Sequence, residues 1–412
     1  MLGGFFYFFF MALLCSQSLM DLGSALLMTS VLVIWFQKNK RGEKMVVPNV
    51  GLEKIFPIWV SIILVGLLIN LRPESPWLKS FLEFRWILEF YAYTAGLMLL
   101  NPKEEDFKKL LPVLTFASLY AVIAYVLKVH PGLEPWESRQ PQMLDFRTGG
   151  LLGNPMPYAH TYGPLGILMT GPILFMNQQQ ILKNKFWIFC AGLTLLGVVL
   201  SFTRGVWIGA ALAMLGMGFL INWKKGLMVL SAGVISAGFL MLAVPSILAR
   251  VIFSLNPTGT YDSERLTIWK ANWLIFTENP IFGLGYSENG YRLREYFDRM
   301  GVPTGFLQSH AHNQYLHFLA GTGVLGLICF LIVIGWFFRL HFKAFKGFDE
   351  KQNPFFKGLS LGVLGAEICF FVSGFTESNF SIAKNRYLIM LMWALGSWLY
   401  FKMKATPSTA KI

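Results

Sequence analysis

Charged residues are scarce in this sequence. Only 14% of its 412 residues are Asp, Glu, Lys or Arg, whereas 55% are hydrophobic, and the mean hydropathy is +0.52. A soluble domain of this length would have to cover its surface with far more charge. Long apolar runs separated by short polar segments instead predict an all-α polytopic membrane protein, because a membrane-spanning helix needs about 20 apolar residues.

Cysteine is rare and the aspartate pair DxD is missing. The four cysteines all fall inside apolar runs, so neither a disulfide framework nor a CxxC metal site is available. Without DxD, the usual aspartate cradle for a metal-bound nucleotide sugar is absent. We therefore expect no cofactor and no resident metal. No basic segment precedes the first apolar run, so a cleaved signal peptide is not expected either.

Twelve apolar runs are long enough, or nearly so, to cross a bilayer. They lie near residues 3–18, 20–36, 55–71, 84–101, 110–128, 158–176, 186–202, 205–222, 226–245, 312–338, 357–375 and 386–402. The first two belong to one apolar stretch that is interrupted by Ser16-Gln17-Ser18 and Asp21. A tight turn there gives twelve spans, and a single tilted helix gives eleven. The whole chain, 1–412, is expected to form one membrane domain.

Lysine and arginine are divided between the two sides of this topology. Eighteen of the 22 lysines fall in loops on one side, which the positive-inside rule makes cytoplasmic. Eleven of the 13 arginines fall on the other side or at its boundary. The net charge of +13 therefore reflects orientation, and no nucleic-acid partner is expected. Because the arginine fork binds phosphate bidentately and lysine does not, the outer face is predicted to hold an anion.

The largest predicted outer loop, 246–311, connects spans 9 and 10 and is too long to be a mere connection. Asp262 or Ser263 is expected to cap a short helix within it. The residues expected to end that helix are Pro280, Gly283 and Gly285. A second stretch, 291–300, alternates apolar residues with arginines and predicts an amphipathic helix lying on the outer leaflet. Its arginines, expected to face solvent or lipid headgroups, are Arg292, Arg294 and Arg299.

Two spans are predicted to enter the membrane from the outer side with polar residues at their first turn. One begins at Arg204, within Ser201–Trp207, and the other begins at His312, within Ser309–His317. Helix N-termini carry unpaired N–H groups and partial positive charge, so they attract anions. With Arg265 of the outer loop, these two helix starts are predicted to bind a pyrophosphate. A neutral His312 imidazole beside it could take the proton of an acceptor hydroxyl.

Structural roles are alternatives for several of these residues. His310 and His312 form an HxH pair that could bind zinc, but no cysteine or nearby carboxylate completes the set in the sequence. Residues i and i+2 do not share a helix face, so only one histidine is expected to be catalytic, with His310 in a supporting position. Arg204 could instead reach lipid headgroups as an interfacial anchor. Arg265 could simply pair with Asp262 or Glu264.

Two further features are more typical of packing than of chemistry. His317 lies roughly 140° around the predicted helix from His312, which favours a buried packing role. The run Gly321–Gly326 favours close helix packing over a phosphate-binding loop.

Taken together, the motifs resemble those of a known family. His312-Asn313, nine residues, and then Gly323-Val324-Leu325-Gly326 resemble the signature of bacterial O-antigen ligases, whose superfamily includes O-antigen polymerases and protein O-oligosaccharyltransferases. Ser201-Phe202-Thr203-Arg204-Gly205 is similar to the superfamily's first arginine motif, and the stretch from Arg265 to Gly285 is similar to its second. The segment Arg147–Pro155 is similar to a weaker upstream motif. The resemblance covers about 140–330, and Ile208 replaces an expected leucine.

The resemblance implies a GT-C-like glycosyltransferase in the inner membrane, with its active site facing the periplasm. Its donor would be polysaccharide on undecaprenyl diphosphate, and its acceptor would be a hydroxyl of lipid A-core, with membrane lipids around it. Arg204 and Arg265 would hold the diphosphate and His312 would activate the acceptor. The supporting residues would be His310, Asn313 and Arg147. The reaction would be metal-independent and inverting.

Three other functions remain open at this point. A repeat-unit polymerase or a protein O-oligosaccharyltransferase would use the same donor chemistry. A transporter of lipid-linked oligosaccharide would also need many spans, but its charges should line a path through the membrane. Here the mid-span candidates are only Glu89 and Glu367, whereas polar groups gather at one face. This distribution favours an enzyme.

Overall fold

The computed structural model describes residues 1–43, 49–71, 85–128, 146–255, 260–302 and 310–405, without the side chains of 253–263. Every regular element within these residues is helical, and a helix lies at each of the twelve predicted apolar runs. These helices are α1 (Leu2–Cys15), α2 (Gln17–Lys40), α3 (Ile55–Ile69), α5 (Arg85–Leu100), α7 (Leu111–Leu127), α8 (Pro155–Ile173), α10 (Lys185–Leu200), α11 (Arg204–Ile221), α12 (Trp223–Ala243), α16 (Gln314–Gly347), α17 (Pro354–Ser373) and α18 (Ala383–Ala405).

The remaining elements lie between these helices. They are α6 (Glu104–Lys108), α9 (Gln178–Lys183), α13 (Pro245–Leu255), α14 (Thr260–Glu278), α15 (Glu288–Arg299) and the short 3-10 turns η1 (Gly150–Leu152) and η2 (Asn379–Ser381).

Six helical segments in the described part of the chain are long and apolar enough to cross a membrane. They are α2, the α6–α7 segment Glu104–Leu127, α11, α12, α16 and α17. Three others, α1, α3 and α10, are apolar but shorter. The chain is therefore a multi-pass membrane protein, and the full count of twelve spans stays a prediction.

The N-terminal apolar stretch folds as two helices. Ser16 has an extended backbone (φ −156°) and separates α1 from α2. The two helices pack closely because Gly23 has no side chain: a Cβ there would lie 3.1 Å from Cα of Phe9. The turn that we considered for this stretch is therefore present.

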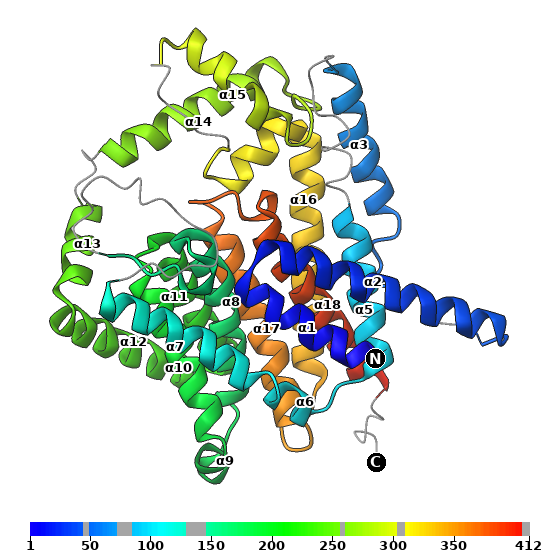
Figure 1. Cartoon of the computed structure of the whole chain (residues 1–412), viewed down its shortest axis with the longest axis vertical. Coiled ribbons are helices and arrows are strands. Elements are labelled where there is room, and N and C mark those ends of the chain that lie inside the picture. Colours follow the sequence, from blue (N-terminus) through cyan, green and yellow to red (C-terminus); the bar gives the residue numbers. More distant parts are fainter. Residues whose placement is uncertain (44–48, 72–84, 129–145, 256–259, 303–309, 406–412) are drawn as a thin grey trace.

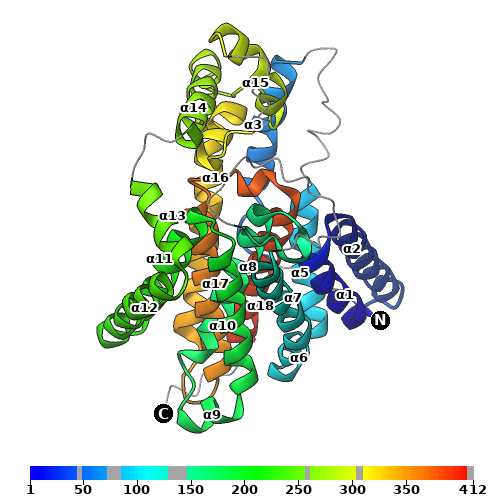
Figure 2. The same ribbon diagram turned by 60° about the vertical axis from the view of Figure 1, so that its left-hand side comes forward.

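Small residues bring α8, α11 and α17 together in the middle of the molecule (Figure 2). A Cβ at Gly171 of α8 would lie 2.2 Å from the carbonyl oxygen of Gly358 in α17. A Cβ at Gly209 of α11 would lie 2.6 Å from the carbonyl oxygen of Cys369. Glycines that allow backbones to touch are a common basis of helix association in membranes.

The two ends of the helical bundle carry different elements. The lysine-bearing α6 and α9 lie at one end, and α14 and α15 lie at the other with the start of α16 (Figure 1). This arrangement is the one that the predicted loop assignment requires. That the end carrying α14 and α15 faces the periplasm stays a prediction.

The outer loop differs from expectation in its first helix. Helix α14 already begins at Thr260, so Asp262 and Ser263 lie within its first turn, and the prediction that one of them caps it is wrong. The helix is also 19 residues long and not short. It ends at Glu278, immediately before the predicted breakers that start at Pro280.

Helix α15 is amphipathic as predicted, but its apolar face covers protein. Leu293, Tyr296 and Phe297 are buried in one cluster with residues of α14 and α16. The expectation that this helix lies on the outer leaflet is therefore wrong, because amphipathic periodicity does not distinguish a lipid surface from a protein surface.

The arginines of α15 also contact protein groups. Arg299 pairs with Glu278 at the end of α14, and Arg294 pairs with Asp298 one turn later in its own helix. Arg292 donates to the backbone carbonyl of Asn70, which follows α3. The contacts of Arg299 and Arg292 tie α15 to α14 and to the end of α3.

Helix α16 is interrupted at Gly323, which has a left-handed backbone (φ 65°). The segment after α14 enters this break. The Val324 amide donates to the carbonyl of Pro280 (2.9 Å), and the Leu284 and Gly285 amides donate to carbonyls of the turn before Gly323 (3.0 and 2.9 Å). A Cβ at Gly323 would lie 2.2 Å from the carbonyl oxygen of Ile281. The glycine run thus serves close packing, as predicted, but against a loop backbone.

Candidate active site

His310 and His312 lie in an irregular segment just before α16. The helix begins at Gln314, two residues later than predicted, and Asn313 is its N-cap. The Asn313 side-chain oxygen accepts from the amides of Tyr315 (3.1 Å) and Leu316 (3.0 Å), as a good cap does. His312 has a left-handed backbone (φ 46°). The expectation that only one of the two histidines faces the site depends on helical geometry, and these two residues precede the helix.

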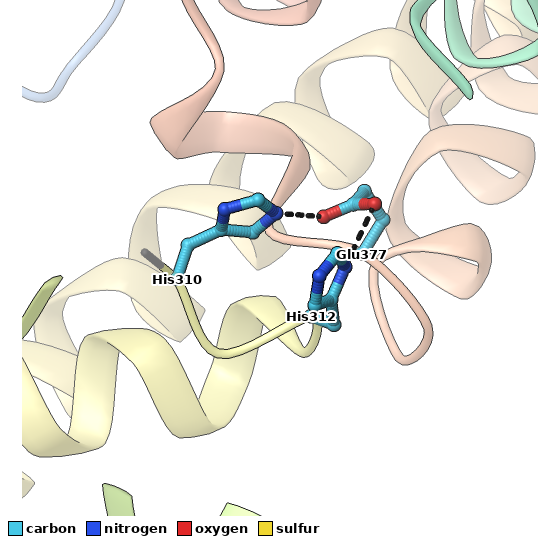
Figure 3. A group of neighbouring side chains, drawn as sticks. All are labelled: His310, His312 and Glu377. Carbon is cyan, nitrogen blue, oxygen red and sulfur yellow. Dashed lines mark hydrogen bonds and ion pairs between the residues drawn. The ribbon is translucent and has the colours of Figure 1, made fainter. Parts of the chain in front are cut away.

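Both imidazoles point at one carboxylate, that of Glu377 (Figure 3). His310 Nε2 lies 2.9 Å from Oε1, and His312 Nδ1 lies 3.1 Å from Oε2. The two ring centroids are 4.1 Å apart. The Glu377 side chain is only 3% exposed, whereas those of His310 and His312 are 29% and 19% exposed. The carboxylate therefore supports two rings that remain partly open to solvent.

Glu377 is held in its anionic form. Burial alone would raise the pKa of this carboxyl, but the hydrogen bonds and charges of His310 and His312 outweigh burial and hold it well below its usual range. A carboxylate only accepts hydrogen bonds, so the ring nitrogen that faces it carries a proton. In a neutral His312 that proton is on Nδ1, which leaves Nε2 as an acceptor.

Glu377 is not among the residues that the sequence predicts for the site. The statement that no carboxylate completes the HxH pair is wrong, because Glu377 contacts both histidines and one donor atom of each residue lies within 4.8 Å of the others. The one available signal was an acidic residue in the short outer loop near 376–385. Nothing in its spacing connects it with His312, which lies 65 residues earlier.

Gln314 fixes the loop of Glu377 to the start of α16. Its amide donates to the carbonyl of Gly374 (2.7 Å), and its side-chain oxygen accepts from the amide of Phe380 (2.9 Å). Because Gln314 is fully buried, both contacts are shielded from water. Glu377 lies between these two anchor points.

Arg204 is the first residue of α11, as predicted, and Arg147 braces the turn before it. Phe202 has a left-handed backbone (φ 54°) in that turn. Arg147 donates through Nε to the carbonyl of Ser201 (2.9 Å) and through Nη2 to Oγ1 of Thr203 (3.3 Å). Arg147 therefore positions the start of α11, and its supporting role in the site stays a prediction.

The start of α11 also contacts the loop that carries Glu377. A Cβ at Gly205 would lie 1.9 Å from Oγ1 of Thr376, the residue before Glu377. The two helix starts that the sequence analysis singled out therefore meet at one loop. Thr376 contacts the start of α11 at Gly205, and the next residue, Glu377, contacts both histidines.

Arg265 approaches the same region from α14 and is partly buried. Its charge and that of Glu377 both act on His160 of α8. One turn after Arg265, Trp269 donates through Nε1 to the carbonyl of Ala311 (3.0 Å), between the two histidines. The alternative that Arg265 pairs with Asp262 involves a side chain outside the described residues.

A family comparison covers part of this site. Residues 189–331 match the family model described as O-antigen ligase. This match covers less than half of the chain and supports membership of the O-antigen ligase family. A comparison with curated proteins found no match.

The O-antigen ligase family contains glycosyltransferase-like enzymes that act on lipid-linked glycans and lipid acceptors. The matched residues include Arg204, Arg265, His310 and His312, and they extend beyond the break in α16 at Gly323. Arg147 and Glu377 lie outside them. The contacts of these two residues therefore come from the structure alone. The boundaries 140–330 for the catalytic region stay a prediction.

His317 has the packing role that its position predicted. It is buried, and its Nδ1 lies 2.9 Å from Nδ2 of Asn289, which also donates to Asn272 (3.0 Å). These three residues come from α16, α15 and α14. They form a buried polar contact that joins α14, α15 and α16.

Proposed function

We propose that this protein is an O-antigen ligase. It transfers polysaccharide from undecaprenyl diphosphate to a hydroxyl of lipid A-core, at the periplasmic face of the inner membrane. The observation that carries the proposal is the pair of contacts from Glu377 to His310 and His312, beside the start of α11, in a chain with a ligase match over 189–331.

Arg204 and Arg265 bind the donor diphosphate in this scheme. Each guanidinium can take two phosphate oxygens in a bidentate pair, and the start of α11 adds the positive end of a helix dipole. The negative charge that develops on the diphosphate as it leaves is stabilised by the same groups. The reaction therefore needs neither a metal nor a cofactor for the leaving group.

His312 is the general base. With its Nδ1 proton directed at Glu377, its Nε2 removes the proton of the acceptor hydroxyl as that oxygen bonds to the anomeric carbon. The bond from this carbon to the diphosphate oxygen breaks with its electron pair on the diphosphate. Because attack occurs opposite the leaving group, the anomeric configuration is inverted. Glu377 orients the ring and stabilises the imidazolium that forms, and His310 shares that carboxylate.

An apolar groove beside the site supports lipid-linked substrates. The groove measures about 490 Å³ and is lined by Leu266, Trp269, Lys270, Trp273, Leu274, Met300 and Leu316. Trp269 also donates to the carbonyl of Ala311, between the two histidines. An isoprenoid or acyl chain bound in the groove would therefore contact a residue that itself touches the histidine segment. The aromatic and aliphatic lining suits such a chain, and the arginines suit its diphosphate.

The deciding experiment compares glycans in a strain that lacks this protein with the same strain complemented by wild type or by His312→Ala. A ligase predicts long chains stranded on undecaprenyl diphosphate and bare lipid A-core in the deficient strain and in the His312→Ala strain. Core that carries a single repeat would instead indicate a polymerase. Normal lipopolysaccharide with lost protein glycosylation would indicate a protein O-oligosaccharyltransferase.

A further inference from the structure

We propose that His310, His312 and Glu377 also form a zinc site whose occupation inhibits the transferase. The inhibition rests on the proposed function, since it requires His312 to act as the base. The metal site itself rests on the geometry of the three side chains alone.

Their donor atoms are close enough to share one ion. The nitrogen–oxygen distances are 2.9 Å from His310 and 3.1 Å from His312 to the two Glu377 oxygens, and one donor atom from each residue lies within 4.8 Å of the others. Zinc binds histidine nitrogen and carboxylate oxygen at about 2.0–2.2 Å, so in a tetrahedral site two donors are about 3.3 Å apart. Both rings are directed at the same carboxylate (Figure 3), so small side-chain rotations would bring the donor atoms to that spacing around an ion.

The charge and access of the site also suit zinc. Glu377 is a buried carboxylate and supplies the negative charge, and two imidazoles supply neutral nitrogen donors. The partly exposed histidine rings give an ion a path from solvent. Three protein ligands leave a fourth position for water, which is the ligand number of an open zinc site.

The backbone holds the three ligands without the metal. Asn313 caps the helix after His312, and Trp269 holds the carbonyl of Ala311 between the two histidines. Gln314 fixes the loop of Glu377 through Gly374 and Phe380. Binding therefore needs little ordering of the chain, which favours affinity.

Zinc in this position removes the base. A metal on Nδ1 of His312 leaves the ring proton on Nε2, so this nitrogen can no longer accept the proton of the acceptor hydroxyl. The ion also takes the carboxylate that would stabilise the imidazolium. Magnesium does not have this effect, because it prefers oxygen ligands in an octahedral arrangement.

The test measures zinc binding and glycan transfer separately, on the purified full-length protein in lipid nanodiscs. Calorimetry with ZnCl₂ is expected to show one zinc per chain, and binding is expected to be lost in His310→Gln and Glu377→Gln. His317→Gln is the matched control, because this histidine lies outside the site, and it should keep the zinc. X-ray absorption of the zinc-loaded wild type gives a second reading that needs no variant: two imidazole nitrogens and carboxylate oxygen at the metal.

The transfer rate of the wild type should fall over the same range of zinc concentration in which calorimetry shows binding. The rate should recover when EDTA is added, and MgCl₂ should leave it unchanged. Absence of binding, a coordination shell without two imidazoles, or unchanged or faster transfer with zinc bound would overturn the inference. Zinc bound by the three residues in a protein that transfers no glycan supports the metal site and counts against the proposed function alone.

Discussion

Nδ1 of His312 lies 3.1 Å from Oε2 of Glu377, although 65 residues separate them in the chain. The carboxylate is buried and the imidazole is partly exposed. Glu377 therefore fixes the ring orientation and determines which nitrogen is available to a substrate, so its own removal should be as informative as that of His312.

Glu377→Gln is expected to lower kcat for glycan transfer by about 10²–10⁴, as seen when the carboxylate behind a catalytic histidine becomes an amide. The amide keeps the size of the side chain but loses its charge, and it can donate a hydrogen bond to the ring. The donor KM should change little, because the arginines are intact. The control is Glu278→Gln on α14, the same exchange at an exposed ion pair. Equal transfer rates for the two variants would show that Glu377 has no role in the reaction.

His312→Ala is expected to lower the transfer rate by about 10²–10⁴ through loss of the general base. His310→Ala should cost less, because this ring contacts Glu377 but is not assigned the proton. Rates are measured with purified donor and lipid A-core in vitro, and both variants are checked for normal yield in membranes. Wild-type transfer by His312→Ala would end the proposed mechanism and leave the fold untouched.

Arg204→Gln and Arg265→Gln are each expected to lower transfer by about 10²–10³, because each removes charge from the site of the leaving diphosphate. Arg299→Gln is the matched control: it is also an outer arginine, but it pairs with Glu278 at the far end of α14. Transfer by this control should stay within about threefold of wild type, as expected for an exposed pair. An equal loss of transfer rate in all three variants would indicate a general effect of outer positive charge. It would contradict the assignment of Arg204 and Arg265 as diphosphate-binding residues.

Gly323→Ala is expected to destabilise the protein by about 1–3 kcal/mol or more, because alanine must adopt φ 65° and its Cβ would lie 2.2 Å from the carbonyl oxygen of Ile281. The midpoint of thermal unfolding in detergent and the yield of folded protein measure this effect. Gly335→Ala on the same helix is the control, since nothing lies within 4 Å of its added Cβ. Similar midpoints for the two variants would show that the break in α16 tolerates a side chain.

Much of the fold follows from hydrophobic periodicity. Each predicted apolar run contains a helix, and Arg204 begins α11 as predicted, because long apolar runs admit few other structures in a membrane. The glycine run 321–326 predicted close packing but not the break at Gly323. Whether glycine continues or interrupts a helix depends on what approaches it, which the local sequence does not contain.

The candidate site was predictable only in part. Arg204 begins α11, His312 lies just before α16, and both carry recognisable chemistry, so local sequence identifies them. Glu377 does not: its role arises when the loop after α17 folds against the start of α16, and the sequence places nothing unusual around it. The lipid-facing assignment of α15 failed for the same reason, since an apolar face does not indicate what covers it.

The backbone contacts between the 280–285 segment and α16 make the large outer loop part of the helix it covers. Residues 280–285 supply hydrogen-bond partners that the interrupted turn would otherwise leave unmet. A chimera that exchanges only the region of α14 and α15 with a relative would replace one set of these hydrogen-bond partners and keep the original partners in α16. An exchange of this region with a relative should therefore use a segment that runs from α14 past Gly323, so that the loop and the helix it contacts are replaced together.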